Sequence, residues 1–120
     1  MIYKLLDADE WRAAKAVGEY RGSAVDLADG YVHFSTADQV VRTAELYFAG
    51  QTGLTMLTVD AARLGDALRW EPSRGGDLFP HLYAPLTVTA IVAEADLPPD
   101  VPVDQGVAAE LRSPSGPGQG

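Results

Sequence analysis

Apolar residues recur at two spacings along the chain, and each spacing predicts a different kind of element. Between Ala37 and Phe48 they recur every three to four residues, which places them on one face of a helix that Thr36 can cap and Gly50 ends. Residues 2–6 and 54–59 are instead short, largely apolar runs typical of β-strands. The chain therefore interleaves helices with short strands.

The opening strand is followed by a predicted first helix. Asp7 or Asp9 can accept hydrogen bonds from the free amides of its first turn, and the helix is expected to run to about Glu19. Trp11 lies on its apolar face. Residues 21–30 are mixed and rich in turn-forming residues, so we expect a loop there.

The second half of the chain predicts further strands. Asp60 is expected to cap a short helix, and the strand after it should end at Glu71 because Pro72 follows. Residues 86–92 are β-branched and alternating, which predicts one continuous strand. The late strands are joined by short links that suit antiparallel pairing.

These elements predict an α+β fold: a single domain with a split, mostly antiparallel sheet and flanking helices. Residues 1–97 form this domain, and residues 98–120 are a Pro/Gly-rich C-terminal extension that we expect to be flexible. Eight residues on apolar faces are expected in the core: Trp11, Val40, Val41, Ala44, Phe48, Met56, Trp70 and Val88.

Composition narrows the function classes. With 120 residues, 47% hydrophobic and 22% charged, the chain is typical of one globular domain, and no apolar run approaches the roughly 20 residues that cross a bilayer. A formal charge of -8 disfavours nucleic acid partners. Neither cysteines nor close histidine spacing suggest a metal site. We expect a cytoplasmic protein without membrane partners; the oligomeric state is open.

Two segments carry candidate chemistry, and the first is the alternating run Tyr31–Ser35. Tyr31, His33 and Ser35 point to one face of this predicted strand. Ser35 and Thr36 lie with the first amides of the following helix, a geometry that suits an anion, although both are also ordinary helix caps. His33 is either a hydrogen-bonded buried histidine or a site residue.

The second segment runs from Arg69 to Tyr83 and reads RWEPSRGGDLFPHLY. Gly75 and Gly76 permit a sharp turn, and Pro80 fixes the backbone before His81, so a rigid loop bearing polar groups is expected. The alternative is a plain turn between strands, with Arg69 and Glu71 paired and His81 hydrogen-bonded locally. In so small a domain we expect one site made of His33, Ser35, Arg69, Glu71, Arg74 and His81.

Known nucleotide fingerprints are absent from the sequence, but a family resemblance is present. No Gly-x-Gly-x-x-Gly follows a strand and no P-loop exists, which argues against both nucleotide-binding folds. The segments 2–4 (IYK), 25–40 (VDLADGYVHFSTADQV), 68–72 (LRWEP) and 79–83 (FPHLY) together resemble the small bacterial domain-of-unknown-function 952 family. That family is similar in fold to the ADP-ribosyltransferase superfamily, in which a split antiparallel sheet holds NAD in a cleft.

The resemblance implies roles for particular residues. His33 with Ser35 or Thr36 is similar to the strand motif that grips the nicotinamide ribose and amide, and His81 or Tyr83 would supply a second ribose contact or a stacking ring. Arg69 and Arg74 would neutralise pyrophosphate.

A catalytic carboxylate is implied less directly by the resemblance. Enzymes of this superfamily commonly use a late-strand glutamate, although some members work without it. Glu71 and Glu94 are the candidates here, and neither lies in a Gln-x-Glu or Glu-x-Glu pattern.

Two function classes follow from the resemblance. One is an ADP-ribosyltransferase or another enzyme that cleaves the glycosidic bond of NAD, with NAD as substrate and no prosthetic group. The other is a non-catalytic ligand-binding or protein-interaction domain that retains the cleft.

Overall fold

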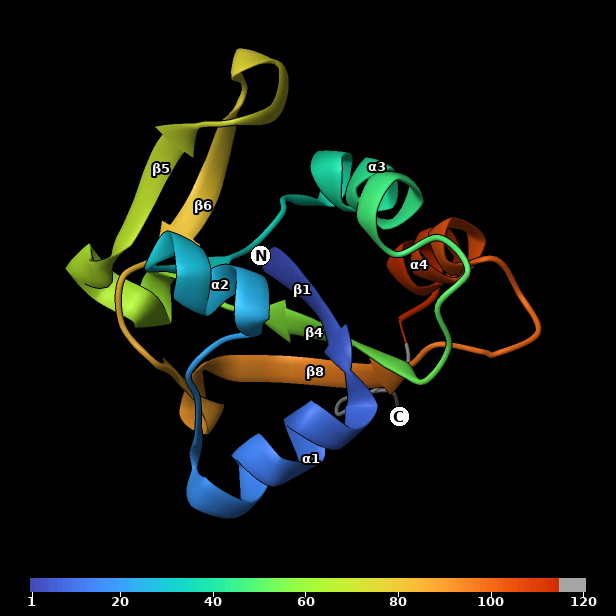
Figure 1. Ribbon diagram of the computed structural model, residues 1–120, viewed down its shortest axis with the longest axis horizontal. Helices are drawn as coiled ribbons and strands as arrows, with labels where there is room; N and C mark the ends of the chain where they lie inside the picture. Colours follow the sequence, from blue (N-terminus) through green and yellow to red (C-terminus); the bar gives the residue numbers. More distant parts are fainter. Residues whose placement is uncertain (115–120) are drawn as a thin grey trace.

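Short strands and helices alternate along the chain in the computed structural model, which describes residues 1–114 (Figure 1). The strands are β1 (Ile2–Asp7), β2 (Glu19–Tyr20), β3 (Val32–His33), β4 (Leu54–Val59), β5 (Leu68–Pro72), β6 (Leu78–Leu82), β7 (Leu86–Thr87) and β8 (Ile91–Asp96). The helices are α1 (Ala8–Val17), α2 (Ala24–Asp29), α3 (Ala37–Tyr47) and α4 (Val103–Arg112). Three short 3-10 helices are η1 (Ala61–Ala67), η2 (Arg74–Gly76) and η3 (Val88–Ala90).

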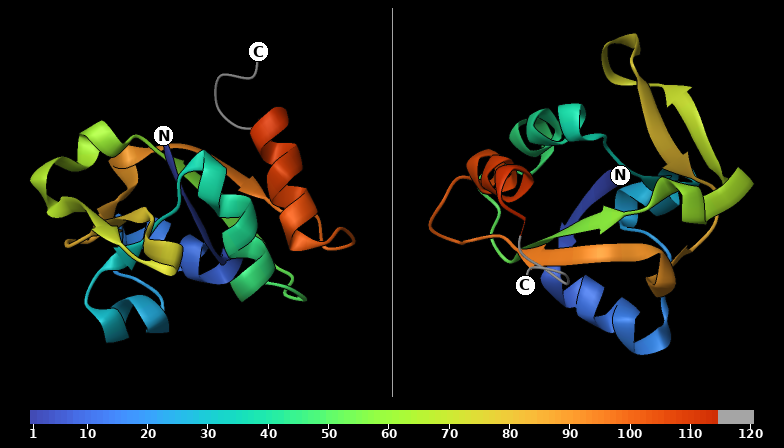
Figure 2. Two further views of the ribbon diagram at one scale, coloured as in Figure 1. Left: turned by 90° about the horizontal axis from the view of Figure 1, so that it is seen from above. Right: turned by 180° about the vertical axis from the view of Figure 1, so that it is seen from behind.

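A three-stranded antiparallel sheet with the order β1-β4-β8 lies between two layers of helices. Alternation along β1 sends Ile2 and Leu6 to the face where Trp11 of α1 packs. Leu5 points to the other face and joins a second apolar cluster with Val40 of α3. Figure 1 and Figure 2 show α1 on one side of this sheet and α3 with α4 on the other. The mixed α+β architecture with antiparallel strands is therefore confirmed.

A second three-stranded sheet has the order β3-β6-β5, and its β5–β6 hairpin projects from the body of the protein (Figure 1). Backbone hydrogen bonds join it to β1, because the Tyr3 amide donates to the Ser35 carbonyl at 2.7 Å and the Ser35 amide donates back at 2.9 Å. His33 pairs with His81, and His81 pairs with Arg69. Directly paired residues in an antiparallel sheet share a face, so these three side chains point the same way.

The segment from Arg69 to Tyr83 is a hairpin and not the expected polar loop. Its strands run to Pro72 and from Leu78, and the tip is closed by a hydrogen bond from the Ser73 amide to the Asp77 carbonyl at 2.9 Å. The Gly75–Gly76 pair adopts φ of 69° and 83°, the left-handed backbone that glycine permits. His81 therefore lies on a strand. The alternative of a turn between two strands is therefore correct for the backbone, and His81 bonds locally to Glu71.

The segment 21–30 contains a helix where a loop was expected. Ser23 and Asp26 form a reciprocal cap: the Ser23 hydroxyl accepts from the Asp26 amide at 3.3 Å, and the Asp26 carboxylate accepts from the Ser23 amide at 2.9 Å. Gly30, at φ 89°, ends the helix.

Residues 86–92 do not form one strand. β7 pairs with β2 and β8 pairs with β4, so the chain changes sheets at the intervening turn η3. Hydrogen bonds fix that turn: the Val88 amide donates to the Gly18 carbonyl at 3.1 Å, and the Ala90 carbonyl accepts from the Asp60 amide at 3.2 Å.

Part of the expected flexible extension is a packed helix. Val103 and Val107 of α4 are buried against Val40 and Ala44 of α3 in the second apolar cluster, and the two helices lie side by side in both figures. Residues 115–120 of the predicted extension lie outside the described residues.

Of the eight expected core residues, Trp70 is the exception, with 46% of its surface exposed on the outermost strand of the hairpin. Trp11, Val40, Ala44 and Met56 are buried. The other three, Val41, Phe48 and Val88, are partly buried and pack against the two clusters. Within residues 1–114, no helix has the length and apolarity that a membrane span requires.

Candidate functional site

A cleft of about 710 Å³ lies along the open edge of β1, where the second sheet, α2 and α3 approach it. Four of the six residues that were expected to form one site line it: His33, Ser35, Arg74 and His81. Arg69 and Glu71 do not line it. His33 lies on β3, Ser35 lies two residues after it, Arg74 lies at the hairpin tip and His81 lies on β6. The pairing of Tyr3 with Ser35 joins this sheet to β1, so that the four residues line one wall.

A buried carboxylate, Asp26 on α2, fixes one end of that wall. Its Oδ1 accepts from the backbone amide of His33 at 3.1 Å and lies 2.6 Å from His33 Nδ1. Its Oδ2 lies 3.1 Å from Lys4 Nζ, and Lys4 also donates to the His33 carbonyl at 2.9 Å. Asp26 and Lys4 are 2% and 7% exposed, so His33 is held by a desolvated ion pair on both its backbone and its ring.

The charge states of this pair follow from opposing effects. Burial alone would raise the pKa of Asp26, but the hydrogen bond from His33 and the charge of Lys4 outweigh it and hold the pKa well below its usual range. Burial lowers the pKa of Lys4, and the neighbouring Asp26 carboxylate opposes that shift. Asp26 is therefore a carboxylate at neutral pH.

The second ring nitrogen of His33 also faces an acid. Nε2 lies 2.9 Å from Oδ2 of Asp29, which is about half exposed at the end of α2. Asp26 and Asp29 both line the cleft together with His33.

Four rings stand together on the polar face of the second sheet. The Tyr31 ring centroid lies 4.6 Å from that of His33, 4.2 Å from that of His81 and 5.1 Å from that of Tyr83. The two histidine rings are 5.5 Å apart, edge to face. His33 and His81, two of the six residues expected to form one site, therefore lie on the same face of the sheet.

Glu71 lies beside this ring cluster but outside the cleft lining. Its Oε1 lies 2.8 Å from His81 Nδ1 and accepts from the Tyr83 hydroxyl at 2.7 Å. These hydrogen bonds hold the pKa of Glu71 below its usual value and raise the pKa of Tyr83. The Arg69 guanidinium stacks 5.0 Å above the Tyr83 ring. Arg69, Glu71 and Tyr83 therefore continue the polar face past the rim of the cleft.

Arg74 reaches the cleft from the hairpin tip. Its Nη1 donates to Thr43 Oγ1 at 3.3 Å, and its guanidinium lies 4.8 Å from the centre of the Phe79 ring. The same Thr43 hydroxyl is 2.9 Å from Ser35 Oγ. Thr36, in contrast, does not line the cleft; its amide donates to Gln39 Oε1 at 3.1 Å within the first turn of α3.

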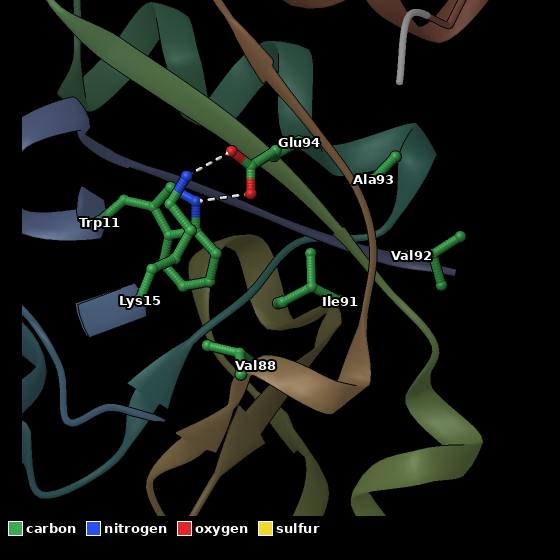
Figure 3. A pocket seen from close by; sticks show the side chains of 7 residues that line it. All are labelled: Trp11, Lys15, Val88, Ile91, Val92, Ala93 and Glu94. Carbon is green, nitrogen blue, oxygen red and sulfur yellow. Dashed lines mark hydrogen bonds and ion pairs between the residues drawn. The ribbon is translucent and has the colours of Figure 1, made fainter. Parts of the chain in front are cut away.

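Glu94 is placed elsewhere. It lies on β8, in a separate pocket of about 260 Å³ beside α1 (Figure 3). Its carboxylate accepts from Trp11 Nε1 at 2.9 Å and from Lys15 Nζ at 2.8 Å. Burial would raise its pKa, but these two hydrogen bonds outweigh burial and lower it. The structure does not bring Glu94 to the cleft that His33 lines.

Sequence reasoning missed Lys4, Asp26 and Asp29 as members of this site. Two signals were available. Lys4 is a charged residue within an otherwise apolar strand, which indicates a buried partner. Ser23 followed three residues later by Asp26 resembles a capping box, and that pattern would have predicted α2. Among residues 1–114, no group of three or more acidic or histidine side chains is arranged to hold a metal ion.

The fold and the cleft together define a small α+β domain with an acid-supported histidine pair on one cleft wall. The chain belongs to the family described as protein of unknown function (DUF952), whose model matches residues 5–94. The X-ray structure of protein CC0527 from Caulobacter crescentus is 50% identical and covers 89% of this chain and 97% of that one, with a TM-score of 0.82.

The solution NMR structure of the same Caulobacter crescentus protein is also 50% identical. It covers 92% of this chain and 97% of that one, with a TM-score of 0.78. The arrangement of the chain is thus shared with CC0527. Among curated proteins, none matches this chain.

Proposed function

We propose that the cleft binds NAD or a related ADP-ribosyl compound. The observation that carries the proposal is the convergence of His33, Ser35, Arg74 and His81 on one wall of a single cleft. A dinucleotide presents hydroxyls, an amide, flat rings and a pyrophosphate, and this wall offers a hydrogen-bonding partner or a ring for each. The resemblance of the His33–Ser35 strand to the ADP-ribosyltransferase motif favours NAD over other dinucleotides.

Each residue takes a role that suits its chemistry. His33 and Ser35 contact the nicotinamide ribose and amide, since an imidazole and a hydroxyl supply a donor and an acceptor two strand positions apart. Arg74 contacts the pyrophosphate, because a guanidinium matches two oxygens at once. Tyr31 provides a flat surface for a base or the nicotinamide ring, and the buried His81 ring packs against it. NAD is a ligand or substrate in this proposal and not a prosthetic group.

Cleavage of the glycosidic bond, by an ADP-ribosyltransferase or a related enzyme, is the second candidate function. The observation that favours it is Glu71, whose lowered pKa keeps it ionised beside His81 on the sheet face that also carries His33. For a ligand that extends from the cleft over the ring cluster, this carboxylate would stabilise the positive charge of an oxocarbenium-like transition state. Glu94 has no part in this candidate because it lines a different pocket.

Titration calorimetry with NAD and with ADP-ribose tests the binding proposal. His33→Ala should weaken binding by about 1 to 3 kcal/mol, because it removes a hydrogen bond to a group that the ligand buries. The exposed Asp100→Ala should bind as the wild type does. Absence of binding at millimolar NAD and ADP-ribose would contradict the proposal and favour a protein-interaction domain.

A nicotinamide-release assay separates binding from catalysis. If Glu71 stabilises the transition state, Glu71→Gln should lower the rate of release by about a hundredfold with little change in NAD affinity. Glu94→Gln is the matched control, and its rate should equal that of the wild type. Binding of NAD without release by the wild-type protein would leave a non-catalytic binding domain.

A further inference from the structure

β5 is the outermost strand of its sheet within residues 1–114, and its free edge faces away from the body of the protein (Figures 1 and 2). Trp70 at its centre is 46% exposed, and both Arg69 and Pro72 are also exposed. An open edge that carries a large exposed aromatic side chain is an unusual surface for a protein to leave uncovered.

The backbone of Trp70 is directed to this edge. Trp70 pairs with Pro80 of β6, which has no amide hydrogen to donate. The Pro80 carbonyl faces the other way and accepts from the Phe34 amide at 3.0 Å. Because a residue in an antiparallel ladder sends both its N–H and its C=O to one side, those of Trp70 point to the open edge.

The charges along β5 are complementary to those of a second copy of the same strand. Arg69 and Glu71 flank Trp70 and share one face of the strand. If a second β5 lies antiparallel with Trp70 opposite the partner's Trp70, each Arg69 lies opposite the partner's Glu71. Opposite charges on directly opposed residues are stabilising. Both Arg69–Glu71 pairs would be non-hydrogen-bonded pairs, in which the two side chains lie closer together.

We propose that the protein forms a two-fold symmetric dimer through β5, centred on Trp70. The two Trp70 residues exchange a pair of N–H···O=C bonds, and the three-stranded sheet continues into that of the partner. Pro72 cannot donate to a partner strand, so the contact is confined to the centre of β5. The contact is isologous and occupies the free β5 edge of both copies, so assembly stops at a dimer.

Analytical ultracentrifugation tests the charge register at physiological ionic strength, where the net charge of -8 is largely screened. The wild type should show a concentration-dependent mass approaching twice 12.8 kDa. Arg69→Glu and Glu71→Arg should each weaken the dimer at least about tenfold, because each opposes like charges twice. The double exchange Arg69→Glu with Glu71→Arg should restore it, since the register then pairs opposite charges again.

Three results would overturn the proposal: a wild type that stays monomeric up to about 1 mM, a dimer insensitive to both single exchanges, or a double exchange no better than the singles. Arg12→Glu, at an exposed position on α1, is the control for a general change of charge and should leave association unaltered. Circular dichroism checks that Glu71→Arg still folds, because Glu71 also bonds His81 and Tyr83.

A cysteine trap tests the same contact without altering Glu71. The chain has no cysteine, so Trp70→Cys introduces a single thiol. The proposed pairing places the two residue-70 Cα atoms about 5.5 Å apart, within the range that a disulfide spans. Mild oxidation should crosslink this variant rapidly, whereas Val17→Cys, exposed at the end of α1, should crosslink slowly. Equal rates for the two variants would overturn the proposal.

Discussion

Asp26 connects three elements through one buried side chain. Its carboxylate contacts Lys4 on β1, the Ser23 amide at the start of α2, and both the amide and the ring of His33 on β3. Removing a charge from such a pair leaves its partner buried and uncompensated, which costs more than the pair itself contributes. The position of His33 therefore depends on a residue that need not touch a ligand.

Asp26→Asn should lower the free energy of unfolding by about 3 to 5 kcal/mol, because Lys4 would then be a buried charge without a counterion. Urea denaturation of the variant measures the difference. Asp38→Asn, at an exposed position in the first turn of α3, should change stability by less than about 0.5 kcal/mol. Equal midpoints for Asp26→Asn and the wild type would show that the ion pair contributes little.

The free energy of unfolding at acid pH also depends on Asp26. The folded state depresses the pKa of Asp26 below the value of about 3.9 of an unfolded chain. The Asp26 carboxylate therefore stabilises the folded state at pH values above this unfolded-state pKa. Its contribution is lost as the pH falls through and below that value. The free energy of unfolding should drop less steeply between about pH 5 and pH 2 in Asp26→Asn than in the wild type. Parallel curves from urea titrations across this range would contradict the assignment.

At the scale of residues, the sequence correctly predicted which side chains share a face with His33. It did not predict the Asp26 carboxylate that holds His33 in place. Alternation in β3 placed Tyr31, His33 and Ser35 on one face, and the same rule applied to the hairpin brings His81 alongside. Asp26 escaped notice because a carboxylate in a turn-rich segment is usually exposed. Its burial depends on Lys4, far away in the sequence, and local pattern carries no information on that contact.

The short helix α2 shows how local patterns mislead at the scale of elements. Val25 and Leu27 are exposed while Asp26 is buried, so its polarity is the reverse of an ordinary surface helix. In residues 86–92 the uniform β-branched alternation predicted one strand, but the chain changes from one sheet to another within this run. The helix α3 was predictable because its apolar stripe faces a core in the usual sense.

Gly22, just before α2, is where the backbone and Asp26 approach most closely. A Cβ atom at Gly22 would lie 2.7 Å from the Cβ of Asp26, at a φ of 124°. Gly22→Ala should therefore destabilise by about 1 to 3 kcal/mol more than Gly30→Ala. Gly30 is the matched control because it also has a positive φ, 89°, but no atom within 4 Å of an added Cβ.

Thermal denaturation of the two glycine variants measures this difference. If the cleft binds NAD as proposed, the same clash should displace Asp26 and weaken NAD binding in Gly22→Ala, while Gly30→Ala keeps the wild-type affinity. Equal melting temperatures for the two would mean that the contact relaxes without cost.

On the scale of the whole molecule, the central sheet separates two apolar clusters, and α4 completes the second. Prolines at 98, 99 and 102 indicated a break in regular structure, which is correct for the link but not for the residues after it. Val103, Val107 and Leu111 recur at helical spacing and were the available signal. Whether these apolar residues of α4 are buried depends on their contact with α3. That contact exists only in the folded protein and cannot be read from the local sequence.

Val107→Asp should lower the free energy of unfolding by more than about 3 kcal/mol, because it places a charge at a fully buried position between α4 and α3. Ala109→Asp, on the exposed side of the same helix, is the control and should be nearly neutral. Chemical denaturation of both variants checks this. Similar midpoints would mean that α4 does not contribute to the cooperative fold.

The Lys4–Asp26 pair has a further consequence for how this protein would respond to engineering. Replacing a buried ion pair with well-packed apolar residues often increases stability. Here the same replacement would release the ring and the backbone of His33 from their fixed positions. A screen for thermostability alone would therefore favour variants in which His33 is less firmly held. Heat resistance and the proposed ligand binding are expected to trade off at this one pair.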